Sequence, residues 1–134
     1  MDMHVLMICP TGQLVYSFKS SLPEVPGIEN VVVDTLHGVL KHQRPGSDRK
    51  VVWTTPTALR KYDVIFVDEA SQYTDTEWDR LYMSVRQQPR APCMVIVGDF
   101  QQLQPIGAGT HCRNFCENPQ YCDRVQLDLS LIHI

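Results

Sequence analysis

The apolar run that ends in two adjacent carboxylates, Tyr62 to Ser71, constrains the fold of this chain more than any other segment. Apolar residues stand at successive positions 64–66, as in a strand with both faces covered in the centre of a parallel α/β sheet. Asp68 and Glu69 follow at the carboxyl end of that strand, where such sheets bind their ligands. One carboxylate there can hold Mg²⁺, directly or through water, and the next can orient a water for attack on a phosphate.

A second apolar run, Cys93 to Val97, ends in a comparable polar segment, Gly98-Asp99-Phe100-Gln101-Gln102-Leu103-Gln104-Pro105. We expect another buried strand that delivers polar side chains to the same edge of the sheet. A glutamine at such an edge can donate one hydrogen bond to a phosphate oxygen and accept another from water. Asp99 is expected to hold the turn through backbone hydrogen bonds.

The remaining elements are predicted from periodicity and from turn residues. Strands are expected at 5–9, 31–33, 51–53, 62–67 and 93–97, and helices from Gly12 to about Ser21, from Thr35 to a polar loop at 42–47, and from a cap at Asp75 or Thr76 to about Gln88. The last helix carries Trp78, Leu81 and Val85 on one face, which predicts core packing. Strands that alternate with helices indicate a βαβ sheet with right-handed crossovers.

These segments resemble motifs of superfamily 1 helicases, closest to the PIF (petite-integration-frequency) and RecD branch. Val67–Ser71 resembles their Walker B motif, and Val97–Pro105 resembles their third motif, the γ-phosphate sensor, where superfamily 2 enzymes usually carry Ser-Ala-Thr. Cys9–Gly12 is similar to the Ala-Pro-Thr-Gly motif that contacts single-stranded DNA, and Asp34–Leu40 to the branch's Thr-x-His segment. All of them occur in the expected order.

The resemblance implies a RecA-like (P-loop NTPase) α/β fold, a parallel sheet flanked by helices, with ATP and Mg²⁺ as cofactors. Asp68 would hold Mg²⁺ through water, Glu69 would polarise the hydrolytic water, and Gln102 would sense the γ-phosphate, or Gln101 if the register differs by one. The implied contacts to nucleic acid are Thr11, Gly12, Thr35 and His37. Alternatives without a ligand are an acidic helix cap at 68–69, a loop amide at 102, helix caps at 11 and 35, and packing of the imidazole at 37.

The activity implied for the intact parent is ATP-driven 5′-to-3′ translocation on single-stranded DNA and duplex unwinding, in settings such as repair, recombination or telomere maintenance. Its partners would be single-stranded DNA and a second RecA-like domain of the same chain. A viral-type superfamily 1 RNA helicase, a nuclease–helicase fusion, and a non-enzymatic relic or binding module of the same fold stay open as alternatives.

Two motifs of the family are missing from the sequence. It has no Gly-x-x-x-x-Gly-Lys-[Ser/Thr] loop, since Phe18-Lys19-Ser20 lacks the preceding glycines. Arg124–Leu129 looks like the strand before the fourth motif, whose arginine does not follow. We therefore expect residues 1–128 to be a partial RecA-like motor domain without its first strand and phosphate loop, and 129–134 a non-native or truncated tail. Such a chain should not hydrolyse ATP alone.

Composition sets wider limits. The chain has 134 residues, enough for one domain, and its 43% hydrophobic and 20% charged content is ordinary for a globular protein. No apolar run approaches the roughly 18 residues that span a bilayer, and no basic start of a signal peptide precedes Val5, so an intracellular location is expected, nuclear or mitochondrial in a eukaryote. The net charge of −3 is unlike that of a general nucleic-acid binder, although a narrow groove can still bind a strand. Free thiols are expected rather than zinc ligands at 111–122, because no paired Cys-x-x-Cys spacing occurs there.

Overall fold

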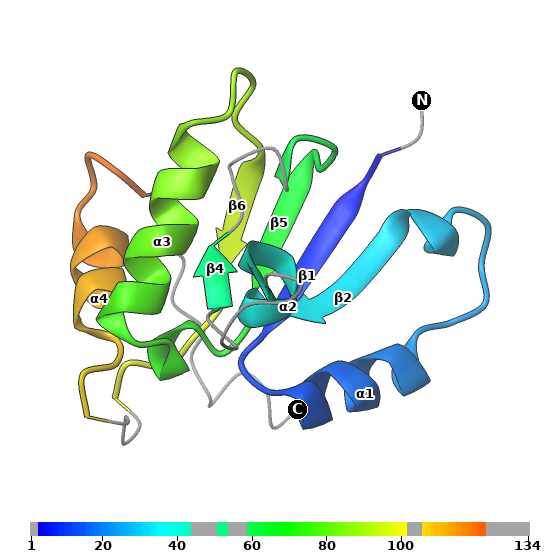
Figure 1. Cartoon of the computed structure of the whole chain (residues 1–134), viewed down its shortest axis with the longest axis horizontal. Coiled ribbons are helices and arrows are strands. Elements are labelled where there is room, and N and C mark those ends of the chain that lie inside the picture. The colour runs from blue at the N-terminus through cyan, green and yellow to red at the C-terminus, as the bar shows by residue number, and fades with distance from the viewer. Residues whose placement is uncertain (1–2, 44–50, 54–58, 102–105, 123–134) are drawn as a thin grey trace, which may run out of the picture.

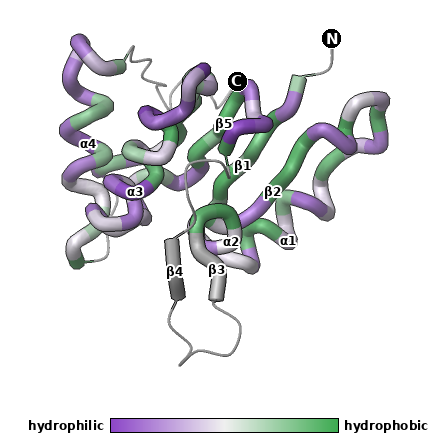
Figure 2. Tube along the Cα trace, turned by 45° about the horizontal axis from the view of Figure 1, so that its top comes forward, coloured by the Kyte–Doolittle hydropathy of each residue, from purple (hydrophilic) through white to green (hydrophobic). Residues whose placement is uncertain are grey.

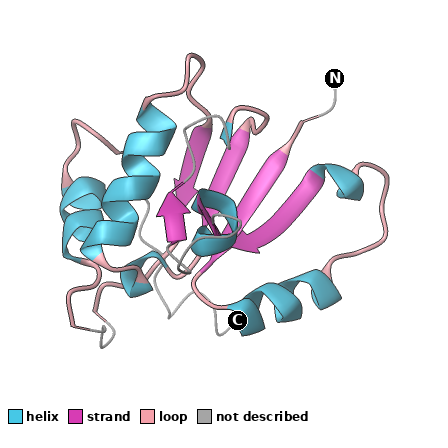
Figure 3. Cartoon of the chain, in the orientation of Figure 1, coloured by secondary structure: helices cyan, strands magenta, loops and turns pink. Residues whose placement is uncertain are grey.

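The computed structural model describes residues 3–43, 51–53, 59–101 and 106–122. Its main sheet is parallel and has the strand order β2-β1-β5-β6 (Figures 1 and 3). The strands are β1 (Val5–Cys9), β2 (Val31–Thr35), β5 (Val64–Val67) and β6 (Cys93–Ile96), and a separate antiparallel pair consists of β3 (Lys41–Gln43) and β4 (Val51–Trp53). The predicted fold class, an incomplete RecA-like parallel sheet flanked by helices, is confirmed.

Within the described residues, four α-helices connect or cover the strands: α1 (Gly12–Ser21), α2 (Leu36–Leu40), α3 (Asp75–Arg86) and α4 (Thr110–Glu117). The 3₁₀ turn η1 (Ile28–Asn30) precedes β2, and the 3₁₀ turn η3 (Ala70–Gln72) follows β5. In Figure 1, α3 and α4 lie side by side at one end of the sheet, and α1 lies beside β2. Among the described residues, no helix is long and apolar enough to cross a membrane.

The core lies on one face of the sheet. Leu6, Ile8, Ile65 and Val67 alternate with half-buried residues along β1 and β5 and are fully buried. Leu36 and Leu40 of α2 and the predicted face of α3, Trp78, Leu81 and Val85, pack against them. Figure 2 shows the hydrophobic residues concentrated along β1 and β2. The expected helical face is therefore confirmed, because residues three and four positions apart share one side of a helix.

The prediction that Cys93–Val97 is buried on both faces is wrong. β6 lies at the edge of the described sheet, so only the face of Met94 and Ile96 packs on the core. Val95 and Val97 are 37% and 52% exposed. The apolar pattern of an interior strand is therefore found here on an edge strand, which natural sheets usually protect.

Two helix boundaries also differ from the prediction. The helix that Thr35 was expected to cap begins at Leu36, as a cap at Thr35 requires, but it gives way to β3 at Lys41 where a polar loop was expected from residue 42; residues 44–47 of that loop lie outside the described residues. α3 is capped by Thr74 rather than by Asp75 or Thr76, because Thr74 and Glu77 form a reciprocal capping box. α4 is a helix that the sequence patterns did not predict, and the strand expected near Arg124–Leu129 lies outside the described residues.

Candidate functional site

The motif segments converge on one edge of the parallel sheet. Register pairs Cys9 of β1 with Thr35 of β2, and Val67 of β5 with both Ile8 and Ile96. The chain therefore leaves β1, β2, β5 and β6 at the same edge, where Thr11, His37, Asp68 and Gly98 follow. This is the edge at which open α/β sheets bind ligands.

The two acids lie in a turn that both neighbouring strands hold in place. The amide of Asp68 donates to the carbonyl of Ile8 at 2.9 Å, and the amide of Ala70 donates to the carbonyl of Val97 at 2.8 Å. Between them Glu69 adopts a left-handed conformation, with φ 50° and ψ 49°. A non-glycine residue in this region is uncommon, and such backbone is concentrated at functional sites.

Gly98 lies directly against this acidic turn. A Cβ at position 98 would come within 3.2 Å of the amide nitrogen of Ala70 and 3.3 Å of that of Ser71. Its φ is not in the left-handed region, so the glycine is required for close approach and not for backbone conformation. The glycine of the second motif thus lets the two motif segments contact each other.

The carboxylate of Asp68 acts on buried groups beneath the turn. Burial raises the pKa of the Cys9 thiol, and Asp68 raises it further. Burial also raises the pKa of the Tyr73 hydroxyl well above its ordinary range, with Cys9 and Asp68 as the next contributors. Both groups stay neutral at physiological pH. The buried hydroxyls of Tyr73 and Ser71 have no hydrogen-bond partner in the described part of the chain, which is rare for polar atoms in protein interiors.

Thr11 and Thr35 both serve as local caps. The Thr11 hydroxyl accepts from the amide of Leu14 at 3.2 Å at the start of α1, and the Thr35 hydroxyl accepts from the amide of Gly38 at 3.0 Å. Each hydroxyl can still donate its proton to another acceptor. Gly12 is exposed, with open space where a Cβ would stand. The capping alternative is therefore confirmed for both threonines without excluding contact to a ligand.

His37 projects from α2 toward α3. Its Nε2 lies 2.9 Å from Oε2 of Glu77. The side chain of His37 is 55% exposed, so it does not pack beneath a groove. Sequence patterns could not single out Glu77 for this contact, because its spacing predicts only a surface position on α3 or a capping box.

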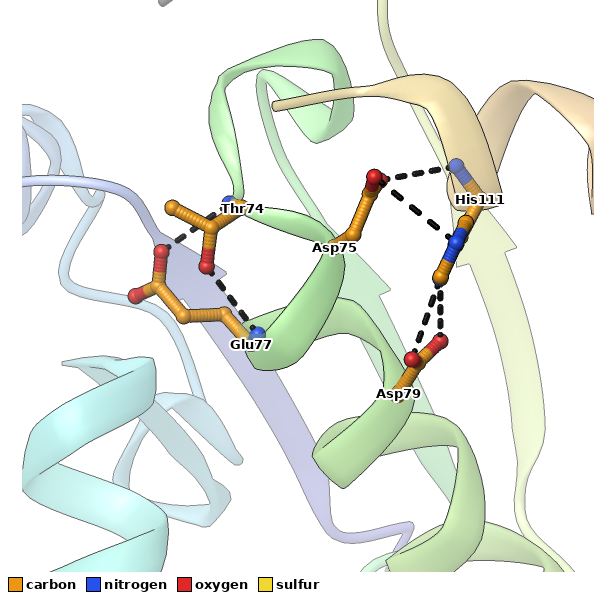
Figure 4. A network of polar contacts seen from close by, with 5 residues as sticks. All are labelled: Thr74, Asp75, Glu77, Asp79 and His111. Carbon is orange, nitrogen blue, oxygen red and sulfur yellow. Dashed lines mark hydrogen bonds and ion pairs between the residues drawn. The ribbon is translucent and has the colours of Figure 1, made fainter. Parts of the chain in front are cut away.

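A second histidine binds the opposite side of the same helix. His111 Nδ1 lies 2.9 Å and 3.0 Å from the two carboxylate oxygens of Asp79, and its backbone amide donates to Oδ1 of Asp75 at 2.8 Å (Figure 4). Its Nε2 lies 3.7 Å from Oδ2 of Asp75. These contacts join the first turn of α4 to the first two turns of α3.

This contact predicts a pH dependence of stability. The hydrogen bond to Asp79 raises the pKa of His111 above its ordinary value of 6.5. Because the folded state binds the proton more tightly, the stabilisation is fully present below the unfolded pKa of about 6.5 and is lost as pH rises through the folded pKa. The difference in unfolding free energy between wild type and His111→Gln should therefore shrink over that window. Urea titrations at stepped pH measure it, and a pH-independent difference would contradict the assignment.

The other predicted residues have mixed outcomes. Asp99 holds its turn as predicted, because its Oδ1 accepts from the amide of Gln101 at 3.0 Å. Gln101 is exposed, and Gln102 lies outside the described residues, so its role stays a prediction. Among the described residues, no group of three or more His, Cys, Asp or Glu side chains could hold a metal, and the cysteines at 112, 116 and 122 form no disulfide.

Comparison with known proteins gives a family match over nearly the whole chain. The model of a family described as AAA domain matches residues 3–130. Among solved structures, a double mutant of Pif1 helicase from Bacteroides is similar at 18% sequence identity and a TM-score of 0.38. The match covers 78% of this chain and 30% of the Pif1 chain, so this chain spans under a third of that protein's length. No curated protein matches this chain.

Proposed function

Because this chain belongs to the AAA domain family, we propose that it is part of the first motor domain of an ATP-dependent DNA helicase. The parent protein would translocate 5′-to-3′ on single-stranded DNA and unwind duplexes. ATP would bind between this domain and a second RecA-like domain. The residues described here would supply the acids that act on nucleotide and part of the surface that binds the strand.

The observation that supports this proposal best is the shared sheet edge. The candidate nucleotide-binding residues, Asp68 and Glu69, follow β5. The candidate contacts to single-stranded nucleic acid follow β1, which pairs with β5, and β2, which pairs with β1. A motor needs both ligands on one rigid element, since hydrolysis at one site must alter the grip at the other. The parallel register provides such a connection through two or three strands.

The residues of this chain fit Mg²⁺ better than they fit the triphosphate of ATP. The carboxylates of Asp68 and Glu69 are half-buried oxygen ligands, which is the donor type that Mg²⁺ prefers. Mg²⁺ bound there would neutralise charge on the phosphates. The triphosphate itself would need a glycine-rich loop that the sequence lacks. Glu69 would orient a water, held by the unusual backbone conformation of its turn.

Binding of single-stranded DNA can be tested on the chain itself. A fluorescent thymidine oligonucleotide should bind with an affinity that falls as salt rises, because phosphate contacts release counterions. His37→Ala should weaken binding about threefold or more, as expected for one lost polar contact of about 0.7 kcal/mol or more. Fluorescence anisotropy at two salt concentrations measures both effects.

His4→Ala is the matched control. His4 is also an exposed histidine, but it lies just before β1, at the opposite edge of the same sheet. Its substitution should leave the affinity unchanged. Equal losses in the two variants, or no salt-dependent binding, would count against the proposal. Tighter binding of a uridine RNA oligonucleotide would favour the RNA helicase alternative.

A further inference from the structure

Glu77 of α3 contacts both α2, which carries the candidate nucleic-acid contact His37, and Thr74, which follows the acidic turn. One carboxylate oxygen, Oε2, lies 2.9 Å from Nε2 of His37. The other, Oε1, accepts a hydrogen bond of 3.0 Å from the amide of Thr74. In return the Thr74 hydroxyl accepts from the amide of Glu77 at 3.1 Å. Figure 4 shows this capping box at the start of α3. The two oxygens of a single carboxylate thus serve two different elements.

The two partners of this contact differ in accessibility. The side chain of His37 is 55% exposed, whereas that of Glu77 is 23% exposed and is held by the cap of α3. An anion from solvent can therefore reach the imidazole, while Oε1 of Glu77 stays on the cap of α3. A ring nitrogen that donates to one oxygen acceptor has no second proton for another. A phosphate at this nitrogen must displace Glu77.

We propose that Glu77 regulates strand binding, because its carboxylate and a backbone phosphate of single-stranded nucleic acid compete for the same nitrogen of His37. The inference rests on the proposed function for the identity of the ligand at His37 and adds a residue that opposes its binding. When the phosphate binds, Oε2 of Glu77 loses its partner, while Oε1 remains on the amide of Thr74.

Loss of the contact between His37 and Glu77 can affect the acidic turn through the short chain segment that joins Glu69 to α3. Thr74 follows η3, whose first turn begins at Glu69, and the amide of Tyr73 closes that turn on the carbonyl of Ala70. Without the lateral contact from His37, the capping carboxylate of Glu77 is held on one side only. The first turn of α3 should then open more often, and the segment next to Glu69 with it.

Glu77→Gln separates the two roles of this residue. A glutamine at the third position of a helix still completes a capping box, so the contact to Thr74 is retained. It removes the negative charge that competes with phosphate. We expect the variant to bind the thymidine oligonucleotide about two- to fivefold more tightly, the range that exposed charge pairs contribute. Fluorescence anisotropy at low salt measures the change.

Asp79→Asn is the matched control, because it removes one carboxylate from the same helix but from the side that faces His111. Its affinity should equal that of wild type, and the gain from Glu77→Gln should disappear in a His37→Ala background. In wild type the oligonucleotide should also accelerate hydrogen exchange of the Glu77 amide.

The outcomes distinguish this inference from the proposed function. Binding that depends on His37 but is unchanged or weakened by Glu77→Gln overturns the inference alone. A gain equal to that of Asp79→Asn, or one that persists without His37, also overturns it, since general electrostatics would explain the result. If no variant binds the oligonucleotide, both the inference and the proposed function fail.

Discussion

Glu69→Gln should reduce ATP turnover by about 10²- to 10⁴-fold, the range that general bases contribute, in a motor completed with a phosphate loop before residue 3 and a second domain after residue 128. Glutamine matches the shape of glutamate and can keep the same backbone conformation, but it cannot take a proton from water. The backbone φ of 50° at this position fixes where the side chain begins, so the two residues should start from the same place. Steady-state ATP hydrolysis in the presence of single-stranded DNA measures the loss.

Glu29→Gln is the control for this loss. Glu29 is an exposed glutamate in η1, before β2, at the end of the sheet away from the acidic turn. Its substitution should leave turnover unchanged. If Glu69→Gln retained more than about a tenth of wild-type turnover, another group would be the base, because even the weakest general bases contribute about 10²-fold. Nucleotide affinity should change less than turnover, as expected for a group that acts mainly in the transition state.

The sheet and its functional edge could be predicted because they depend on local patterns. Strands form where the apolar runs at 5–9, 62–67 and 93–97 predict them, although β5 begins only at Val64 and β6 ends at Ile96. In a parallel sheet the carboxyl ends of strands meet at one edge. The order of the motifs therefore placed Asp68 near the ends of β1 and β6 without any distance information. The prediction that β6 is buried on both faces was wrong, because an apolar pattern does not reveal which strand lies at the side of a sheet.

The contacts around α3 could not be predicted, because they join side chains far apart in the sequence. His111 meets Asp79 across 32 residues, and its amide meets Asp75 across 36. No periodicity relates such positions. α4 was missed for a related reason: its segment, Thr110–Glu117, has mixed polar and apolar residues whose helical face is clear only once Cys112 and Phe115 pack on the core.

The first turn of α3 therefore holds several parts of the molecule together. Its acidic side chains, Glu77 and Asp75, contact His37 of α2 and His111 of α4, and Thr74 just before it forms a β-bridge with Ala108. In addition, the amide of Asp75 donates to the carbonyl of Gly107 at 2.9 Å. The chain leaving β6 is thus fixed to the acidic segment at both ends, first at Ala70 and then at Thr74. A shift of the acidic turn and of Thr74 would therefore move Val97 and Ala108, which precede and follow Gln102 in the sequence.

Gly98→Ala should destabilise the protein by about 1–3 kcal/mol, the usual cost of overpacking a well-filled site. The new Cβ would stand 3.2 Å from the amide nitrogen of Ala70 and 3.3 Å from its Cβ. These atoms cannot easily retreat, because the same amide donates to the carbonyl of Val97 at 2.8 Å. Relief of the contact would therefore move the turn that carries Glu69. Urea unfolding followed by circular dichroism measures the loss.

Gly12→Ala provides the control, with an effect of opposite sign. Nothing lies within 4 Å of a Cβ at position 12. Gly12 is the first residue of α1, and its φ is not in the left-handed region. Alanine there should stabilise the protein by about 0.4–1 kcal/mol, because it restricts the unfolded chain at no steric cost. Substitution of glycine by alanine at these two positions thus separates the effect of unfolded-chain entropy on stability from the effect of a steric contact. Should Gly98→Ala match or exceed the stability of wild type, the acidic turn and the chain after β6 do not approach each other closely enough to exclude a Cβ at position 98.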